Sequence, residues 1–122
     1  MKNNSQKQGR EGEIAARNYL LKQGYEVLEQ NWRYKKYEID IIAKKDETLV
    51  FVEVKTRKNG TFGEPELSVT RQKQGFLIAA AKQYLIEKDV ELESRFDIIA
   101  VIRLNNNHTV KHLEGAFYPL LK

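Results

Sequence analysis

The chain has 122 residues, a formal net charge of +4 and no cysteine. Its length predicts one domain spanning residues 1–122, and the lack of cysteine excludes disulfide bonds, thiolate metal sites and a cysteine nucleophile. No stretch approaches the ~20 apolar residues of a membrane span, and the polar start does not resemble a signal peptide. We therefore expect a cytoplasmic protein in which about residues 1–8 are frayed.

Hydrophobic periodicity predicts two helices and five strands. A helix over residues 8–23 ends at Gly24 and is followed by strands over 25–33, 37–44 and 48–56. Asn59-Gly60 and Pro65 mark a loop over 58–65. Thr70 can cap a helix over 71–88, and strands over 96–104 and 109–113 complete the order. The side of the 71–88 helix expected to be buried consists of Phe76, Leu77, Ala80, Ala81, Tyr84 and Leu85.

This order predicts an α/β fold in which a mixed sheet is flanked by helices. The short connection over 45–47 should pair strands 37–44 and 48–56 as a hairpin. The helix over 71–88 is long enough to cross over the sheet and set strand 96–104 parallel to a neighbour.

Basic residues gather in three short clusters, which are Arg33-Tyr34-Lys35-Lys36, Lys55-Thr56-Arg57-Lys58 and Arg71-Gln72-Lys73. Such clusters can neutralise the phosphates of a nucleic acid and speed its association. A solvated, lysine-rich surface explains the charge equally well, so charge alone does not identify a partner.

The predicted hairpin carries acids and a lysine that alternation places on one face. The residues expected on that face are Glu38, Asp40 and Ile42 of the first strand and Phe51, Glu53 and Lys55 of the second. Ile39 and Ile41 are expected together on the opposite face.

A two-residue turn at Asp46-Glu47 would set Asp40 opposite Glu53, whereas a three-residue turn would shift the pairing by one residue. Opposed carboxylates, with Cβ atoms roughly 5 Å apart, repel unless a cation lies between them. Mg²⁺ or Mn²⁺ suits such oxygen ligands, and the backbone carbonyl of Val54 could supply another.

Lys55 could hold a phosphate oxygen, orient or deprotonate a water, or stabilise developing charge. The pattern therefore predicts hydrolysis by metal-activated water without a covalent intermediate. The alternative is that Glu53 and Lys55 are ordinary surface residues at a strand end.

The aspartate followed by Glu-x-Lys on a hairpin resembles the signature of the PD-(D/E)xK nuclease superfamily. Four segments in order, GREGE at 9–13, EIDIIA at 38–43, VFVEVKTR at 50–57 and RFD at 95–97, resemble more closely the bacterial YraN family. That family is described as endonuclease-like and distantly related to archaeal Holliday junction resolvases. The resemblance runs from about residue 9 to 117.

The resemblance implies a restriction-endonuclease-like αβββαβ core, with Asp40 and Glu53 as metal ligands and Lys55 as the catalytic lysine. It also implies that Glu13 reaches the metal directly or through water, although a helix start favours an acid in any case. The sequence departs from the pattern at Ile39, where the superfamily has proline, and at Tyr37, where the family usually has glycine. Tyr37 would either alter the approach to DNA or place an aromatic ring near it.

Further basic and polar residues are candidates for contacts to nucleic acid, through phosphates or at the start of the second helix. They are Lys35, Lys36, Arg57, Lys58, Thr70 and Lys73. For Thr70 and Lys73, routine helix capping and solvation are equally good interpretations. Arg95 and Asp97 are expected to form a structural ion pair, and His108 and His112 are not expected to bind zinc.

We therefore expect a metal-dependent endodeoxyribonuclease that uses Mg²⁺ or Mn²⁺, with branched DNA or repair intermediates among its candidate substrates. The alternatives are a nucleic-acid-binding module without catalysis on the same fold, and a protein-interaction domain with a structural metal site. Kinship with the resolvases implies a homodimer, and no contact with membranes is expected.

Overall fold

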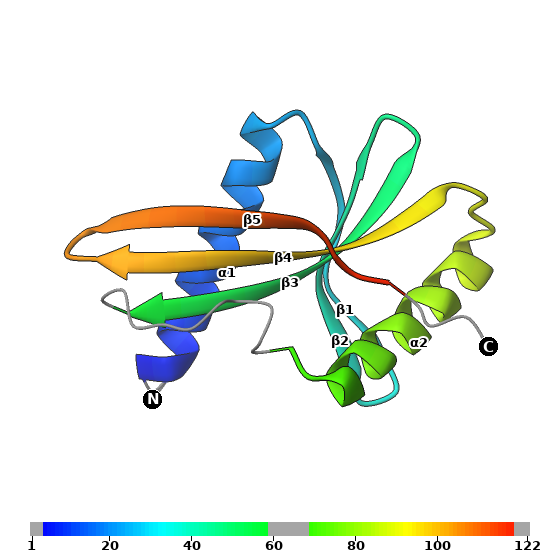
Figure 1. Cartoon of the computed structure of the whole chain (residues 1–122), viewed down its shortest axis with the longest axis horizontal. Coiled ribbons are helices and arrows are strands. Elements are labelled where there is room, and N and C mark those ends of the chain that lie inside the picture. Colours follow the sequence, from blue (N-terminus) through cyan, green and yellow to red (C-terminus); the bar gives the residue numbers. More distant parts are fainter. Residues whose placement is uncertain (1–3, 59–68, 119–122) are drawn as a thin grey trace.

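Two helices and five strands follow one another in the predicted order in the computed structural model, which describes residues 4–58 and 69–118 (Figure 1). The elements are α1 (Asn4–Lys22), β1 (Glu26–Tyr34), β2 (Tyr37–Lys45), β3 (Thr48–Lys58), α2 (Arg71–Lys88), β4 (Glu93–Leu104) and β5 (Asn107–Phe117). The predicted α/β fold is confirmed. Except for Lys58, the loop predicted over 58–65 lies outside the described residues.

The observed bounds agree with the predicted ones for α2, whereas β4 begins earlier than predicted and β5 is longer at both ends. Both strands are longer than their apolar cores, because neighbouring strands supply hydrogen-bonding partners to polar residues at their ends: Glu93 pairs with Thr48, and Asn107 pairs with Leu104. Pairing thus overrides the low strand propensity of these residues. Helix α1 begins at Asn4, four residues before the predicted start.

The five strands form one sheet in the order β1-β2-β3-β4-β5. All neighbours are antiparallel except β3 and β4, whose parallel pairing confirms the crossover predicted for α2. The β1–β2 hairpin crosses the direction of β3, β4 and β5, as the twist of the sheet requires (Figure 1).

Each face of the sheet is covered by one helix (Figure 1). On one face α2 buries Leu77, Ala80, Ala81 and Tyr84 against Ile42, Phe51, Phe96 and Ile98. On the other face α1 buries Ala16 and Leu20 against Ile41, Val50, Val52, Ile99 and Val101. The central strands are therefore buried on both sides, and this packing fixes the position of the β2–β3 hairpin. Neither described helix has the length and apolar character needed to cross a membrane.

The prediction that Ile39 and Ile41 share a face is wrong. Ile39 packs on the α2 side, whereas Ile41 packs on the α1 side. The neighbouring strand explains the change, since Asn31 of β1, with φ of 51°, adopts the left-handed conformation between the residues paired with Ile41 and Ile39. Simple alternation therefore fails next to Asp40.

Phe76 also departs from its predicted place. It was expected among the buried residues of α2, but its side chain is partly exposed and lines a cavity. It precedes Leu77, which does enter the core.

Candidate metal centre

Asp40 lies where β2 separates from β3. The two strands pair with the predicted register from Lys45 and Thr48 to Ile41 and Val52, after which the ladder ends. The next residues along this register are Asp40 and Glu53. In place of a further backbone pair, the Val54 N–H donates to Asp40 Oδ2 over 2.8 Å. The side chain of Asp40 therefore occupies the opening between the strands.

Glu53 is buried, with 4% of its surface exposed, and forms ion pairs with two lysines. Its Oε2 lies 3.5 Å from Lys55 Nζ on the same strand and 2.6 Å from Lys73 Nζ in the first turn of α2. The predicted proximity of Glu53 and Lys55 is confirmed. Lys73 was predicted to contact nucleic acid at the start of the second helix. In the structure its side chain extends from α2 to Glu53 on β3.

Two further carboxylates lie beside Asp40. Glu13 of α1, Glu38 and Asp40 each offer an oxygen within 4.8 Å of the other two. The amide of Asn31 donates to Glu13 Oε1 over 2.9 Å and to Glu38 Oε2 over 3.3 Å. Glu13 therefore lies next to Asp40, as the family resemblance implied.

Glu38 and Asn31 were not among the site residues predicted from the sequence. A signal for Glu38 existed, because it is two residues from Asp40 on one strand and was already expected on the same face. No comparable signal exists for Asn31, whose position depends on its left-handed backbone conformation.

The electrostatics of the cluster favour a cation. Burial, the charge of Glu53 and the smaller effects of Glu13 and Glu38 raise the pKa of Asp40 to about 8, against the opposing effect of the Val54 N–H. For Lys73, burial lowers the pKa, but the hydrogen bond and charge of Glu53 outweigh burial and raise it. Glu53 thus has cationic partners, whereas Asp40 and Glu13 accept hydrogen bonds from neutral N–H groups.

The donor set fits a hard divalent ion. Carboxylate oxygens from Glu13, Glu38 and Asp40 are the kind of ligands that Mg²⁺ and Mn²⁺ take. Burial is the largest cause of the raised pKa of Asp40, and an ion among these acids would offset the further contribution from the charges of its neighbours. The predicted ligand roles of Glu53 and of the Val54 carbonyl stay predictions.

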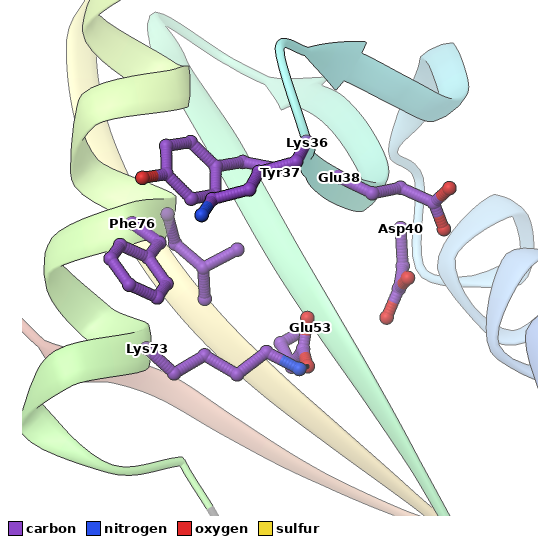
Figure 2. Close-up of a pocket in the computed structure, with 8 residues that line it drawn as sticks. Lys36, Tyr37, Glu38, Asp40, Glu53, Lys73 and Phe76 are labelled. Carbon is purple, nitrogen blue, oxygen red and sulfur yellow. Dashed lines mark ion pairs between the residues drawn. The ribbon is translucent and has the colours of Figure 1, made fainter.

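A cavity of about 260 Å³ opens beside these acids (Figure 2). Glu38, Asp40 and Glu53 line it, together with Lys36 from the turn between β1 and β2. From α2, Lys73 extends across the cavity to Glu53, and the rings of Tyr37 and Phe76 lie together on the α2 side (Figure 2). The acids therefore form one wall of a pocket whose other wall is aromatic.

The other candidates for nucleic-acid contact occupy varied positions. Thr70 is the N-cap of α2, where its hydroxyl accepts from the Lys73 N–H over 3.1 Å, so the capping interpretation is confirmed. Lys35 is exposed, with its Nζ 5.3 Å from the centre of the Tyr34 ring. Arg57 is partly exposed on β3, and the side chain of Lys58 lies outside the described part of the structure.

A second polar cluster lies on the α1 side of the sheet. The fully buried Asp97 accepts hydrogen bonds from both Arg95 Nε and Nη2 over 2.9 Å, which confirms the predicted ion pair. His112 Nε2 lies 2.7 Å from the same carboxylate, and His112 Nδ1 lies 3.1 Å from the Tyr19 hydroxyl. These contacts join β4, β5 and α1, so His112 has a structural role.

Comparison with known proteins identifies close relatives. A profile described as "Uncharacterised protein family UPF0102" matches residues 12–101. A UPF0102 protein of Flavobacterium psychrophilum is 46% identical over 110 residues, which cover 90% of this chain and 92% of the relative. One from Phocaeicola vulgatus is 44% identical over 91% of this chain and 92% of its own length. One from Thermodesulfovibrio yellowstonii is 44% identical over 90% of this chain and 95% of its own.

Proposed function

The chain belongs to the uncharacterised family UPF0102, the YraN family predicted from its motifs, and we propose that it is a metal-dependent endonuclease that hydrolyses phosphodiester bonds in DNA. The observation that carries the proposal is the cluster of Glu13, Glu38 and Asp40 beside the Glu53–Lys55 ion pair. Grouped carboxylates next to a fixed ammonium group provide what hydrolysis of a phosphodiester needs, a site for a cation and a positive partner for the phosphate.

Each residue has a role in this proposal. Glu13, Glu38 and Asp40 would hold Mg²⁺ or Mn²⁺, with Glu53 as a further ligand. A divalent ion in such a site polarises the phosphate and lowers the pKa of a bound water. Lys55, held 3.5 Å from Glu53, would neutralise a phosphate oxygen as water displaces the leaving oxygen at phosphorus.

The partners and setting belong to the same proposal. DNA is the expected partner, the protein would act in the cytoplasm, and two copies would form a homodimer with two sites. Branched, flapped and nicked DNA are the candidate substrates. Lys35, Lys36 and Arg57 would contact backbone phosphates, which positions a nucleic acid without reading its sequence.

A non-catalytic binding module would not need this arrangement of acids. Glu53 and Glu38 have basic partners. Asp40 and Glu13 instead accept hydrogen bonds from neutral N–H groups, so grouping them costs stability and repels a phosphate backbone in the absence of a cation. In a purely DNA-binding protein, apolar or basic residues would serve better at these positions. The cluster therefore favours catalysis over simple binding.

A cleavage panel tests the proposal. Flapped, branched, nicked, single-stranded and continuous duplex DNA are incubated with the protein and Mg²⁺ or Mn²⁺, and products are resolved on denaturing gels. We expect cleavage of at least one substrate by the wild type. Asp40→Ala and Glu53→Ala should each lower the rate on the order of 100-fold or more, since loss of outer-shell partners of a metal already lowers activity by roughly 10- to 100-fold.

Glu47→Ala is the matched control, because Glu47 is an exposed acid in the turn of the same hairpin. It should cleave like the wild type. Cleavage that persists in both site variants would refute the assignment, and DNA binding without any cleavage would favour the binding module.

A further inference from the structure

The cavity beside the acidic cluster has an aromatic wall formed by Tyr37, which also packs against the α2-side core, and Phe76. Tyr37 and Phe76 stack with ring centres 4.5 Å apart and planes 15° apart, and both side chains are partly exposed. Phe76 lies beside the buried stripe of α2 rather than within it, and it is not among the residues that pack in the α2-side core. A partly exposed aromatic pair next to charged groups is typical of a binding surface.

The size of the cavity limits what it can hold. Its volume of about 260 Å³ is slightly below the roughly 300 Å³ at which pockets for drug-sized molecules begin. One flat ring system fits such a space, whereas a stacked base pair does not. Leu77 is a further apolar residue that lines the cavity.

With a divalent ion held by its carboxylates, the opposite wall would suit the phosphate of the same nucleotide. Glu38 and Asp40 lie across the cavity from the aromatic rings, and Lys73 crosses between the walls (Figure 2). Lys36 lines the cavity from the hairpin turn. A single nucleotide has its base and its phosphate separated by one sugar, so it can contact both walls at once.

We propose that this pocket binds one unpaired nucleotide, with its base packed against the aromatic wall formed by Tyr37 and Phe76 and its phosphate directed to the acidic cluster. The inference rests on the proposed endonuclease function and names its substrate class. A base in a continuous duplex has both faces covered by its neighbours, so an aromatic wall can bind it only after it leaves the stack. The substrate is therefore DNA with an unpaired nucleotide at the cleavage point, such as a flap, a gap or an open branch.

Binding measurements test this inference without relying on cleavage. Fluorescence anisotropy compares a single strand with the duplex of the same sequence, in Ca²⁺ buffer, with gels to verify that the DNA stays intact. We expect the wild type to bind the single strand about tenfold more tightly or better, because stacking of a base on an aromatic side chain contributes on this order. Tyr37→Ala and Phe76→Ala should each lower single-strand affinity by about tenfold and leave duplex affinity unchanged.

Conservative and distant variants provide the controls. Tyr37→Phe keeps the ring and should bind like the wild type. Tyr118→Ala removes an exposed aromatic residue that does not line this cavity, and it should also leave affinity unchanged. Equal affinity of the wild type for single strand and duplex, or equal losses on both in the alanine variants, would overturn the inference.

A second measurement needs no variant. An oligonucleotide with 2-aminopurine at one unpaired position reports stacking directly, and its fluorescence should fall when the wild type binds. Absence of quenching at every unpaired position would overturn the pocket assignment even if the alanine variants failed to fold.

The two proposals can fail separately. Quenching and single-strand preference without cleavage would refute the endonuclease and leave the pocket in place. Cleavage that depends on Asp40 but is equally fast on continuous duplex, without quenching, would refute the pocket and leave the endonuclease in place.

Discussion

Asp40 is the residue at which the proposed activity conflicts most directly with stability. It fills the opening between β2 and β3, next to Glu53, Glu13 and Glu38. Its pKa of about 8 in the folded chain lies above the ordinary value of 3.8. Because the folded state holds this proton more tightly than the unfolded state, ionised Asp40 opposes folding increasingly as the pH rises from about 4 to 8.

Asp40→Asn should therefore stabilise the metal-free protein at neutral pH. Asparagine keeps an oxygen that can accept from the Val54 N–H, while its amide can donate to a neighbouring carboxylate. We expect the free energy of unfolding in EDTA to rise by about 1–2 kcal/mol, a few degrees in Tm. Thermal unfolding with and without Mg²⁺ measures both effects, and Mg²⁺ should raise the Tm of the wild type much more than that of the variant.

The exposed Glu47 again supplies the comparison, as Glu47→Gln should change neither the Tm in EDTA nor the response to Mg²⁺. Equal Mg²⁺ responses in the wild type and Asp40→Asn would show that the ion binds elsewhere.

Two site residues show what local sequence can and cannot reveal. Hairpin register was enough to bring Asp40 near Glu53, and alternation along β3 was enough to bring Glu53 near Lys55, because both relations lie within one pair of adjacent strands. The contact between Lys73 and Glu53 was not predictable in this way. Twenty residues separate them, and the contact depends on how α2 packs across β3, which no local pattern encodes.

At the level of elements, the approach of α1 to β3 sets the position of Glu13. Gly12 is buried, and a Cβ atom at this position would overlap the side-chain oxygen of Thr56 on β3. The helix can therefore lie close to the strand only because Gly12 has no side chain. Glu13 follows directly and reaches the acidic cluster.

Gly12→Ala should push α1 away from the sheet. We expect a loss of about 1–3 kcal/mol in the free energy of unfolding from overpacking, together with weaker binding of Mg²⁺. Denaturant unfolding and calorimetric titration with Mg²⁺ measure the two losses.

The same helix offers a matched control at Gly9, where a Cβ atom would meet nothing within 4 Å. Gly9→Ala should stabilise the helix by roughly 0.5–1 kcal/mol. Thr56→Ala combined with Gly12→Ala should recover much of the loss, since it removes the overlapping oxygen. If Gly12→Ala behaved like Gly9→Ala, close packing at this point would not position Glu13.

The elements themselves were largely predictable, and the exception is informative. Helix α2 has a threonine cap and a periodic apolar stripe, so local signals and tertiary structure agree over Arg71–Lys88. The change of face along β2 between Ile39 and Ile41 was not predictable, because it depends on the left-handed Asn31 in the neighbouring strand. This irregularity lies beside the proposed metal centre, where the β2–β3 ladder ends, and departures from local rules are expected at functional sites.

For the whole molecule, the cluster around Asp97 joins elements that are distant in sequence. Arg95 and Asp97 belong to β4, His112 and Gly115 to β5, and Tyr19 to α1. Burial raises the pKa of Asp97, but the hydrogen bonds from His112, Arg95 and the Gly115 N–H outweigh burial and lower it below 3.8. The folded structure therefore favours the ionised form of Asp97.

This shift has a definite sign for stability. Since the unfolded state binds the proton more tightly, the contribution of Asp97 is fully present above about pH 4 and is lost as the pH falls through the lowered folded value. Asp97→Asn should lower the free energy of unfolding at pH 7 by about 3 kcal/mol, because it removes the fully buried carboxylate that holds Arg95 and His112. As a charged partner, the partly exposed Arg95 would then keep only Glu114, at the longer distance of 3.4 Å. The substitution should also flatten the fall in stability below about pH 4. Urea unfolding across this range, with the exposed Glu91→Gln as the control, measures both effects; parallel stability curves for the wild type and Asp97→Asn would show that acid destabilisation arises from other carboxylates.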